Sequence, residues 1–151
     1  LDYALWNLIL LSPEFPKMDE SIKHSNISVL DLSCSGYNQR SFQNVDALTN
    51  CINLTSLNLY GCTFLQNVDG LTNLPNLTSL DFSGCYSLQN VDGLGNLSNL
   101  INLNLTYCES INNLDGLLNC KNLEKINLKG IMPVIESFAD NRLKNLNGLK
   151  N

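Results

Sequence analysis

The sequence predicts an α/β-type repeat solenoid, with a parallel β-sheet along one face of the coil and short 3₁₀ or helical turns, or loops, along the other. Two observations predict it. Units that start at Leu54, Leu77, Leu100 and Leu123 repeat every 23 residues, and a fixed period of this size is typical of stacked supersecondary units. Within each unit the hydrophobic pattern changes from a period of two to a period of about three, which indicates a strand followed by a tight turn.

Residues 1–26 precede the first clear unit, and we expect them to form an N-terminal helical cap or a preceding irregular repeat. Their most apolar stretch, "ALWNLILL" from Ala4 to Leu11, lacks the basic flank and the small-residue cleavage site of a signal peptide. It is also shorter than the ~20 apolar residues that span a bilayer. The simplest interpretation is a buried helix that covers the open end of the first coil, without membrane insertion.

The repeats occupy residues 27–151. Their five units start at Ile27, Leu54, Leu77, Leu100 and Leu123. The first unit is longer than the others because "CSGYNQR" adds about four residues, and the last contains the insertion "IMPVIESFADNR" and is incomplete. Irregular loops on a rigid scaffold often carry recognition, so the two insertions are one candidate contact region.

Each regular unit divides into a strand and a turn. In "LTSLDF", residues 77–82, apolar and polar side chains alternate, so one face of the strand is buried. In "LQNVDGLGNL", residues 88–97, apolar residues recur at every third position, which is typical of a 3₁₀-like turn that packs as the opposite wall. A single unit cannot bury these residues alone, whereas stacked units with strands about 4.8 Å apart can.

The pattern L-x-x-L-x-L-x-x-C-x-x-L, repeated every 23 residues, resembles the leucine-rich-repeat proteins over residues 27–151. The repeat length and the "VDGLxNLxNL" half resemble short bacterial repeats of the internalin type, while the cysteine at the ninth position resembles the cysteine-containing class. The resemblance implies a leucine-rich-repeat coil with its sheet on the concave face and its turns on the convex face. It also implies binding of proteins through the concave face.

The six cysteines could indicate disulfides, a zinc site or buried thiols. One position of successive coils holds three of them: Cys62, Cys85 and Cys108. The resemblance implies that this side chain turns inward and bonds to backbone groups of the turn. Cys51 and Cys120 fall at a core position, and Cys34 lies near the cysteine column but displaced from it. Buried thiols that act as small hydrophobes explain five of the six, and no C-x-x-C pair supports a metal site.

An aspartate column repeats with the same period: Asp46, Asp69, Asp92 and Asp115. We expect each carboxylate to be an N-cap that accepts backbone N–H groups two and three residues on, and the following glycine to let the chain bend. Asn147 takes this place in the last unit, and an N-cap needs an acceptor rather than a charge. A calcium ladder would need several converging oxygens, so the sequence predicts no metal.

Composition and motifs argue against several function classes. The net charge is −5 and only 15% of residues are charged, so no basic surface exists for nucleic acid or an anionic membrane. The single histidine, His24, lies in the polar segment "KHSN". No phosphate-binding loop, G-x-S-x-G elbow or H-E-x-x-H motif is present. We therefore predict neither an enzyme nor a cofactor.

The outward side chains of the strands are the candidate protein-binding residues. They are Asp31, Asn58, Tyr60, Asp81, Asn102, Asn104, Tyr107, Lys125, Asn127 and Lys129. Tyr60 and Tyr107 are the best anchors because aromatic side chains offer large contact area at low entropy cost. Small polar residues also keep an exposed sheet soluble, so the polar positions have a second explanation. We expect Asn58→Arg or Asn104→Arg to abolish binding with the melting temperature nearly unchanged.

The sequence thus predicts a non-catalytic recognition module for a protein partner that it does not identify. The alternative is a structural or sensor segment of a larger multidomain protein, which contacts other domains of its parent chain through its insertions and ends. The chain begins at Leu1 and stops inside an unfinished repeat, which favours a piece of a longer protein. Unpaired buried thiols are more typical of an intracellular, reducing compartment, and nothing else in the sequence indicates a location.

Overall fold

The computed structural model describes residues 27–34 and 42–131. The predicted N-terminal cap, most of both insertions and the incomplete end of the last unit lie outside the described residues. His24 and Asn147 lie outside them as well, so the predictions about these two residues stay predictions.

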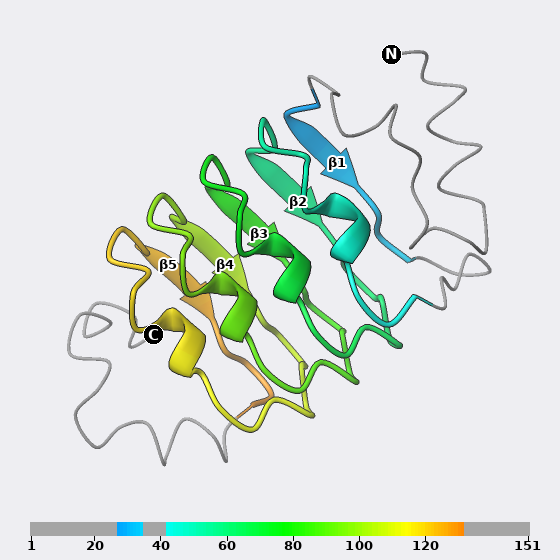
Figure 1. The fold of residues 1–151 in the computed structure, drawn as a ribbon. Helices are drawn as coiled ribbons and strands as arrows, with labels where there is room; N and C mark the ends of the chain where they lie inside the picture. Colours follow the sequence, from blue (N-terminus) through cyan, green and yellow to red (C-terminus); the bar gives the residue numbers. More distant parts are fainter. Residues whose placement is uncertain (1–26, 35–41, 132–151) are drawn as a thin grey trace.

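Five short strands form one parallel sheet in the order β1-β2-β3-β4-β5 (Figure 1). They are β1 (Val29–Asp31), β2 (Ser56–Asn58), β3 (Ser79–Asp81), β4 (Asn102–Asn104) and β5 (Lys125–Asn127). The register pairs equivalent repeat positions, so that Leu57 lies opposite Leu80, and Leu80 opposite Leu103. In the middle strands the central residue is buried and its two neighbours are half-buried. The predicted parallel sheet and its alternation are confirmed.

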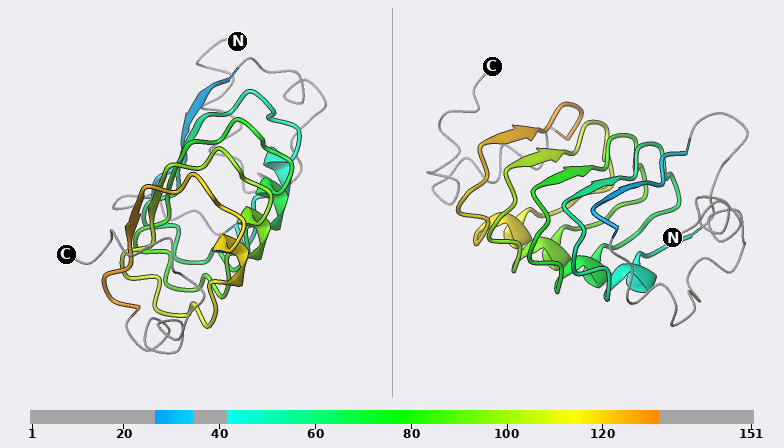
Figure 2. Two further views of the ribbon diagram at one scale, coloured as in Figure 1. Left: turned by 90° about the vertical axis from the view of Figure 1, so that its left-hand side faces the viewer. Right: turned by 90° about the horizontal axis from the view of Figure 1, so that it is seen from above.

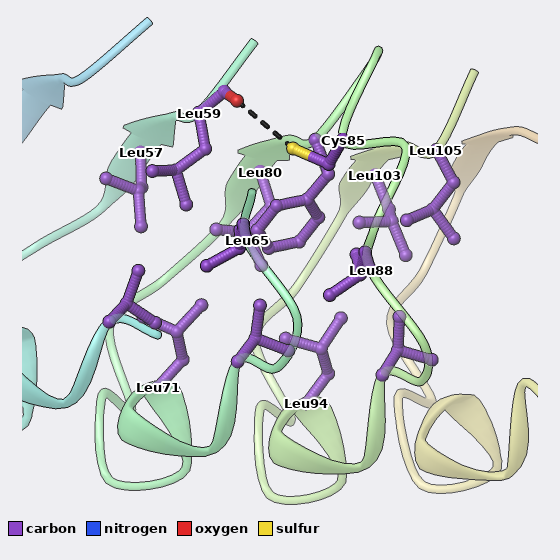
Figure 3. Packing of buried hydrophobic residues seen from close by; sticks show 14 of the residues in the cluster. Leu57, Leu59, Leu65, Leu71, Leu80, Cys85, Leu88, Leu94, Leu103 and Leu105 are labelled. Atoms are coloured by element: carbon purple, nitrogen blue, oxygen red, sulfur yellow. Dashed lines mark hydrogen bonds between the residues drawn. The ribbon is translucent and has the colours of Figure 1, made fainter. Parts of the chain in front are cut away.

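Along the described residues, four 3₁₀ helices follow the strands. They form the opposite wall of the coil, as the two views in Figure 2 show. They are η3 (Asp46–Leu48), η4 (Asp69–Leu71), η5 (Asp92–Leu94) and η6 (Asp115–Leu117). The leucine-rich core lies between the two walls (Figure 3), and Leu59, Phe82 and Leu94 in it are fully buried. The predicted short 3₁₀ turns are therefore confirmed.

The N-cap prediction for the aspartate column is wrong. Each aspartate is the first residue of its 3₁₀ helix, the N-cap is an apolar residue such as Val91, and none of the four helices has a side-chain cap hydrogen bond. An asparagine two residues upstream closes the turn instead: Asn90 Oδ1 accepts the backbone N–H of Asp92 at 3.1 Å. The carboxylate is exposed in the first turn, next to N–H groups that carry partial positive charge.

The glycine of the "VDGL" motif has a different role from the predicted bend. Gly70, Gly93 and Gly116 do not have positive φ angles, but each lies against the backbone of the preceding coil. A Cβ built on Gly93 would lie 2.2 Å from the carbonyl oxygen of Val68. Only glycine allows two coils to approach this closely.

All six cysteines are buried, and none forms a disulfide. The thiol of Cys85 donates a hydrogen bond to the carbonyl of Leu59 at 3.2 Å (Figure 3), and that of Cys108 donates to the carbonyl of Phe82 at 3.1 Å. Each bond thus links a turn to the strand region of the preceding coil rather than to its own turn. Burial raises the pKa of Cys85, and it raises the pKa of Cys108 to about 12. The prediction of buried thiols is confirmed.

Candidate protein-binding face

The ten predicted binding residues come together at the sheet. Asp31, Asn58, Asp81, Asn104 and Asn127 are the last residues of their strands and are aligned by the parallel register. Asn102 and Lys125 are the first residues of β4 and β5, whereas Tyr60, Tyr107 and Lys129 follow the ends of strands. We call the outward side chains of β1–β5 and of the loop residues directly after them the strand face.

The last residue of every strand closes a tight turn with its own side chain. In each case Oδ1 accepts the backbone N–H two residues on, at 2.8–3.2 Å. The accepting residues are Asp31, Asn58, Asp81, Asn104 and Asn127. Aspartate and asparagine favour such turns because their short side chains reach the backbone two residues on. This column therefore ends the strands as well as facing outward.

A hydrogen-bond network joins two of these turns across the sheet. Asn104 Nδ2 donates to Asp81 Oδ2 at 3.3 Å, and Thr106 Oγ1 donates to Asn104 Oδ1 at 2.7 Å. The hydroxyl of Ser83 donates to the other oxygen of the Asp81 carboxylate. The expectation that arginine at position 58 or 104 leaves the melting temperature unchanged conflicts with these bonds, because the substitution removes the turn acceptor.

The side chain at the first position of each strand does not close a turn. In the described part of the chain, the side chains of Ser56, Ser79 and Asn102 form no hydrogen bond. They are half-buried, and the equivalent Lys125 is exposed. Val29 occupies the same column and is 67% exposed. Substitutions in this column change the surface without disturbing a turn, and sequence reasoning had selected only two of its members.

Tyr107 holds an unusual backbone conformation at the edge of the strand face. Its φ is 58°, whereas the equivalent residues in three other units are glycines with φ of 71°, 74° and 88°. A non-glycine residue in this region is uncommon and costs free energy. The next coil leaves room for the tyrosine ring, because a Cβ on Gly130 would lie 2.6 Å from Cδ1 of Tyr107. Lys129 Nζ lies 5.5 Å from the ring centroid, within cation–π range.

In the described loops that follow the strands, four aromatic side chains are exposed. They are Tyr60, Phe64, Tyr86 and Tyr107, with 51%, 47%, 48% and 42% of their surface exposed. Sequence reasoning missed Phe64 and Tyr86 because these residues lie beyond the strand positions of their units. The available signal was an aromatic residue at a position where the neighbouring units carry small or polar residues.

A shallow groove follows the other end of the strands, with a volume of about 440 Å³. It is lined by Asn53, Thr55, Asn76, Thr78, Asn99, Ile101, Asn122 and Glu124. Three of its asparagine side chains donate to carbonyls of the preceding coil at 2.8–2.9 Å. These residues were not among the predicted binding residues, although the asparagine that recurs before each unit was a visible signal.

In residues 27–34 and 42–131, no three His, Cys, Asp or Glu side chains are grouped to hold a metal ion. No helix there has the length and hydrophobicity needed to cross a membrane.

No protein-family model and no curated protein matches the chain. Among solved structures, internalin C2 from Listeria monocytogenes superposes with a TM-score of 0.55 and is 22% identical; the match covers 72% of this chain and 49% of that one. A leucine-rich-repeat protein from Leptospira interrogans is 20% identical over 75% of this chain and 34% of its own, with a TM-score of only 0.39. This chain thus spans about half the length of internalin C2. The first superposition, together with the register of the parallel sheet, shows that the chain has the leucine-rich-repeat fold.

Proposed function

We propose that this chain is a non-catalytic module that binds a protein partner through the strand face and the aromatic loops beside it. The observation that carries the proposal is Tyr107. Its backbone adopts a conformation that glycine, present in three other units, adopts at lower cost. The backbone gains nothing from a tyrosine at this position, but the tyrosine keeps a partly exposed ring beside Lys129.

The arrangement suits recognition of a protein surface. Exposed tyrosines supply large contact area, and they dominate the binding energy of many interfaces. The turns that carry them are held by the hydrogen bonds of Asn58 and Asn104, so little conformational entropy remains to be lost on binding. Tyr60 follows β2 and Tyr107 follows β4, so one coil of the repeat scaffold separates them along the same face.

The test replaces Tyr60 and Tyr107 by the residues that the unit starting at Leu77 carries at the equivalent positions. The double variant Tyr60→Ser, Tyr107→Gly makes both loops resemble the loop of Ser83 and Gly84, and retains every turn acceptor. We expect an unchanged or higher melting temperature, because the strain at Tyr107 is removed. Partners captured by the wild-type chain, once purified and titrated by calorimetry, should bind the variant at least tenfold more weakly, since each lost anchor is worth ~2 kcal/mol.

The matched control changes an equally exposed apolar side chain on the other wall. Leu118, the residue directly after η6, is 42% exposed, and Thr72 holds the equivalent position directly after η4. Leu118→Thr should bind the captured partner as the wild type does. Full affinity of the tyrosine variant, with loss of affinity in Leu118→Thr, would assign recognition to the turn wall instead of the strand face.

A further inference from the structure

The thiols of Cys34 and Cys62 lie in contact, with their sulfur atoms 3.1 Å apart. We propose that this pair is an oxidation site, which closes to a disulfide by exchange with a low-molecular-weight disulfide such as oxidised glutathione. The proposal concerns a covalent modification of the coil and does not depend on the binding function.

Within the described coils, the repeat explains why only the boundary between the first two units brings a thiol beside the cysteine column in this way. The backbone N–H of Cys34 bonds to the carbonyl of Tyr60, as that of Gly61 bonds to Ser83 and that of Gly84 to Thr106. Cys34 therefore occupies the position that glycine holds in the next two units. Cys85 and Cys108 consequently face a glycine at the equivalent place, whereas Cys62 faces the thiol of Cys34.

Both thiols also converge on one acceptor. The carbonyl of Leu32 lies 3.4 Å from the sulfur of Cys62 and 3.7 Å from that of Cys34. A disulfide needs a sulfur–sulfur distance of ~2.05 Å, so the two atoms must close by only about 1 Å. Rotation about the side-chain bonds can supply such a movement, and the backbone hydrogen bonds between the two coils can remain intact.

The reaction proceeds through two thiol–disulfide exchanges. Cys34 is 8% exposed and Cys62 is fully buried, so Cys34 reacts first. Its thiolate attacks oxidised glutathione, forms a mixed disulfide and releases one glutathione. The thiolate of Cys62 then attacks the sulfur of Cys34 and releases the second glutathione. Two protein thiols are oxidised, one glutathione disulfide is reduced, and the two protons pass to the two glutathione thiolates.

Three other buried thiols provide an internal contrast. Those of Cys85, Cys108 and Cys120 donate to backbone carbonyls at 3.1–3.3 Å. Burial raises the pKa of all three, which keeps them protonated and unreactive at neutral pH. Oxidation under native conditions should therefore stop at one disulfide.

In the experiment that tests this proposal, the full chain is incubated with excess oxidised glutathione under native conditions. Its free thiols are then counted after denaturation. We expect two of the six thiols to be lost, with a mass decrease of two hydrogens and no retained glutathione. Peptide mapping of the wild-type protein should identify a Cys34–Cys62 cross-link. Retention of all six thiols, or a cross-link between any other pair, would overturn the proposal.

Serine variants identify the two cysteines of the disulfide without peptide mapping. Cys34→Ser and Cys62→Ser should each prevent intramolecular disulfide formation, while Cys85→Ser should still lose two thiols. Far-UV circular dichroism establishes that each variant is folded before oxidation. An intramolecular disulfide that persists in folded Cys34→Ser would refute the assignment; if either serine variant fails to fold, the wild-type cross-link map alone decides.

Discussion

Gly93 sets how closely two coils can approach. A Cβ at this residue would lie 2.2 Å from the carbonyl oxygen of Val68 and 2.8 Å from Cα of Asp69, distances that real Cβ atoms do not tolerate. The obstacle is backbone rather than a flexible side chain, so it cannot rotate away. The glycines of the three "VDGL" or "LDGL" motifs are therefore required by contact between coils. The first described unit carries a half-buried alanine, Ala47, at the same position.

A pair of alanine substitutions tests this explanation within one turn. Gly93→Ala should lower the free energy of unfolding by about 3 kcal/mol or more, because two coils must separate to admit the methyl group. Gly95→Ala, two residues on, should change it by less than about 0.5 kcal/mol or raise it, since its φ of −58° suits alanine and the nearest atom is 3.3 Å away. Urea denaturation measures both. Equal costs at the two positions would refute the role assigned to Gly93.

The buried thiols predict a pH dependence of stability. Burial raises the pKa of Cys108 from 9.0 to about 12, so above pH 9 the unfolded chain loses this proton while the folded chain keeps it. The native state then binds more protons, and stability present below pH 9 is lost as the pH rises toward 12. The loss approaches ~1.4 kcal/mol per pH unit for one thiol. The difference between wild type and Cys108→Ala, measured by urea denaturation from pH 8 to 10.5, should decrease with pH; a constant difference would contradict the assignment.

At the scale of the strand, the outward column has two kinds of position. Asn104, the last residue of β4, accepts from the backbone and hydroxyl of Thr106 and donates to Asp81. Asn102, the first residue of the same strand, forms no side-chain hydrogen bond in the described part of the chain. The same residue type is therefore structural at one end of the strand and available for contact at the other.

Alanine substitution of the two asparagines separates these roles. Asn104→Ala should cost about 1–3 kcal/mol of stability, because it removes the turn acceptor and leaves the N–H of Thr106 without it. Asn102→Ala should change stability by less than about 0.5 kcal/mol. Thermal unfolding monitored by circular dichroism provides the comparison. A result in which Asn102→Ala is the more destabilising variant would show that the turn network contributes little.

The sequence predicted the elements well because each depends on local periodicity. The strands around Leu57 and Leu80 and the turns around Leu71 and Leu94 follow directly from apolar spacing. It failed on the aspartate column, because the motif does not show whether Asp92 precedes the 3₁₀ helix or begins it. That depends on Asn90, whose bond to the backbone N–H of Asp92 sets where the turn starts.

Contacts between coils could not be predicted from one unit alone. The thiol of Cys85 bonds to Leu59 of the preceding coil, and Gly93 contacts Val68 of the preceding coil. The sequence identified the candidate binding residues only as a set of outward positions along the strands. Only the three-dimensional structure shows which of these side chains are held in turns. It also shows that Tyr107 takes the place of a glycine with positive φ.

At the scale of the whole molecule, stability should vary along the coil. In a solenoid each unit contacts only its neighbours, so a unit with a neighbour on both sides buries its core residues more completely. Leu80 in β3 is 2% exposed, whereas the equivalent Ile126 in β5 is only partly buried. Within the described residues, β5 pairs with β4 alone.

Truncation of these two equivalent residues tests the gradient. Leu80→Ala should cost ~3–5 kcal/mol, because it opens a cavity between two packed coils. Ile126→Ala should cost ~1–2 kcal/mol, since less apolar surface leaves water when this side chain folds. Urea denaturation gives the two free energies, and hydrogen exchange should show earlier opening of β5 amides than of β3 amides in the wild type. Equal costs and equal protection would mean that the fifth coil is packed as tightly as the third in solution, and that stability is uniform along the solenoid.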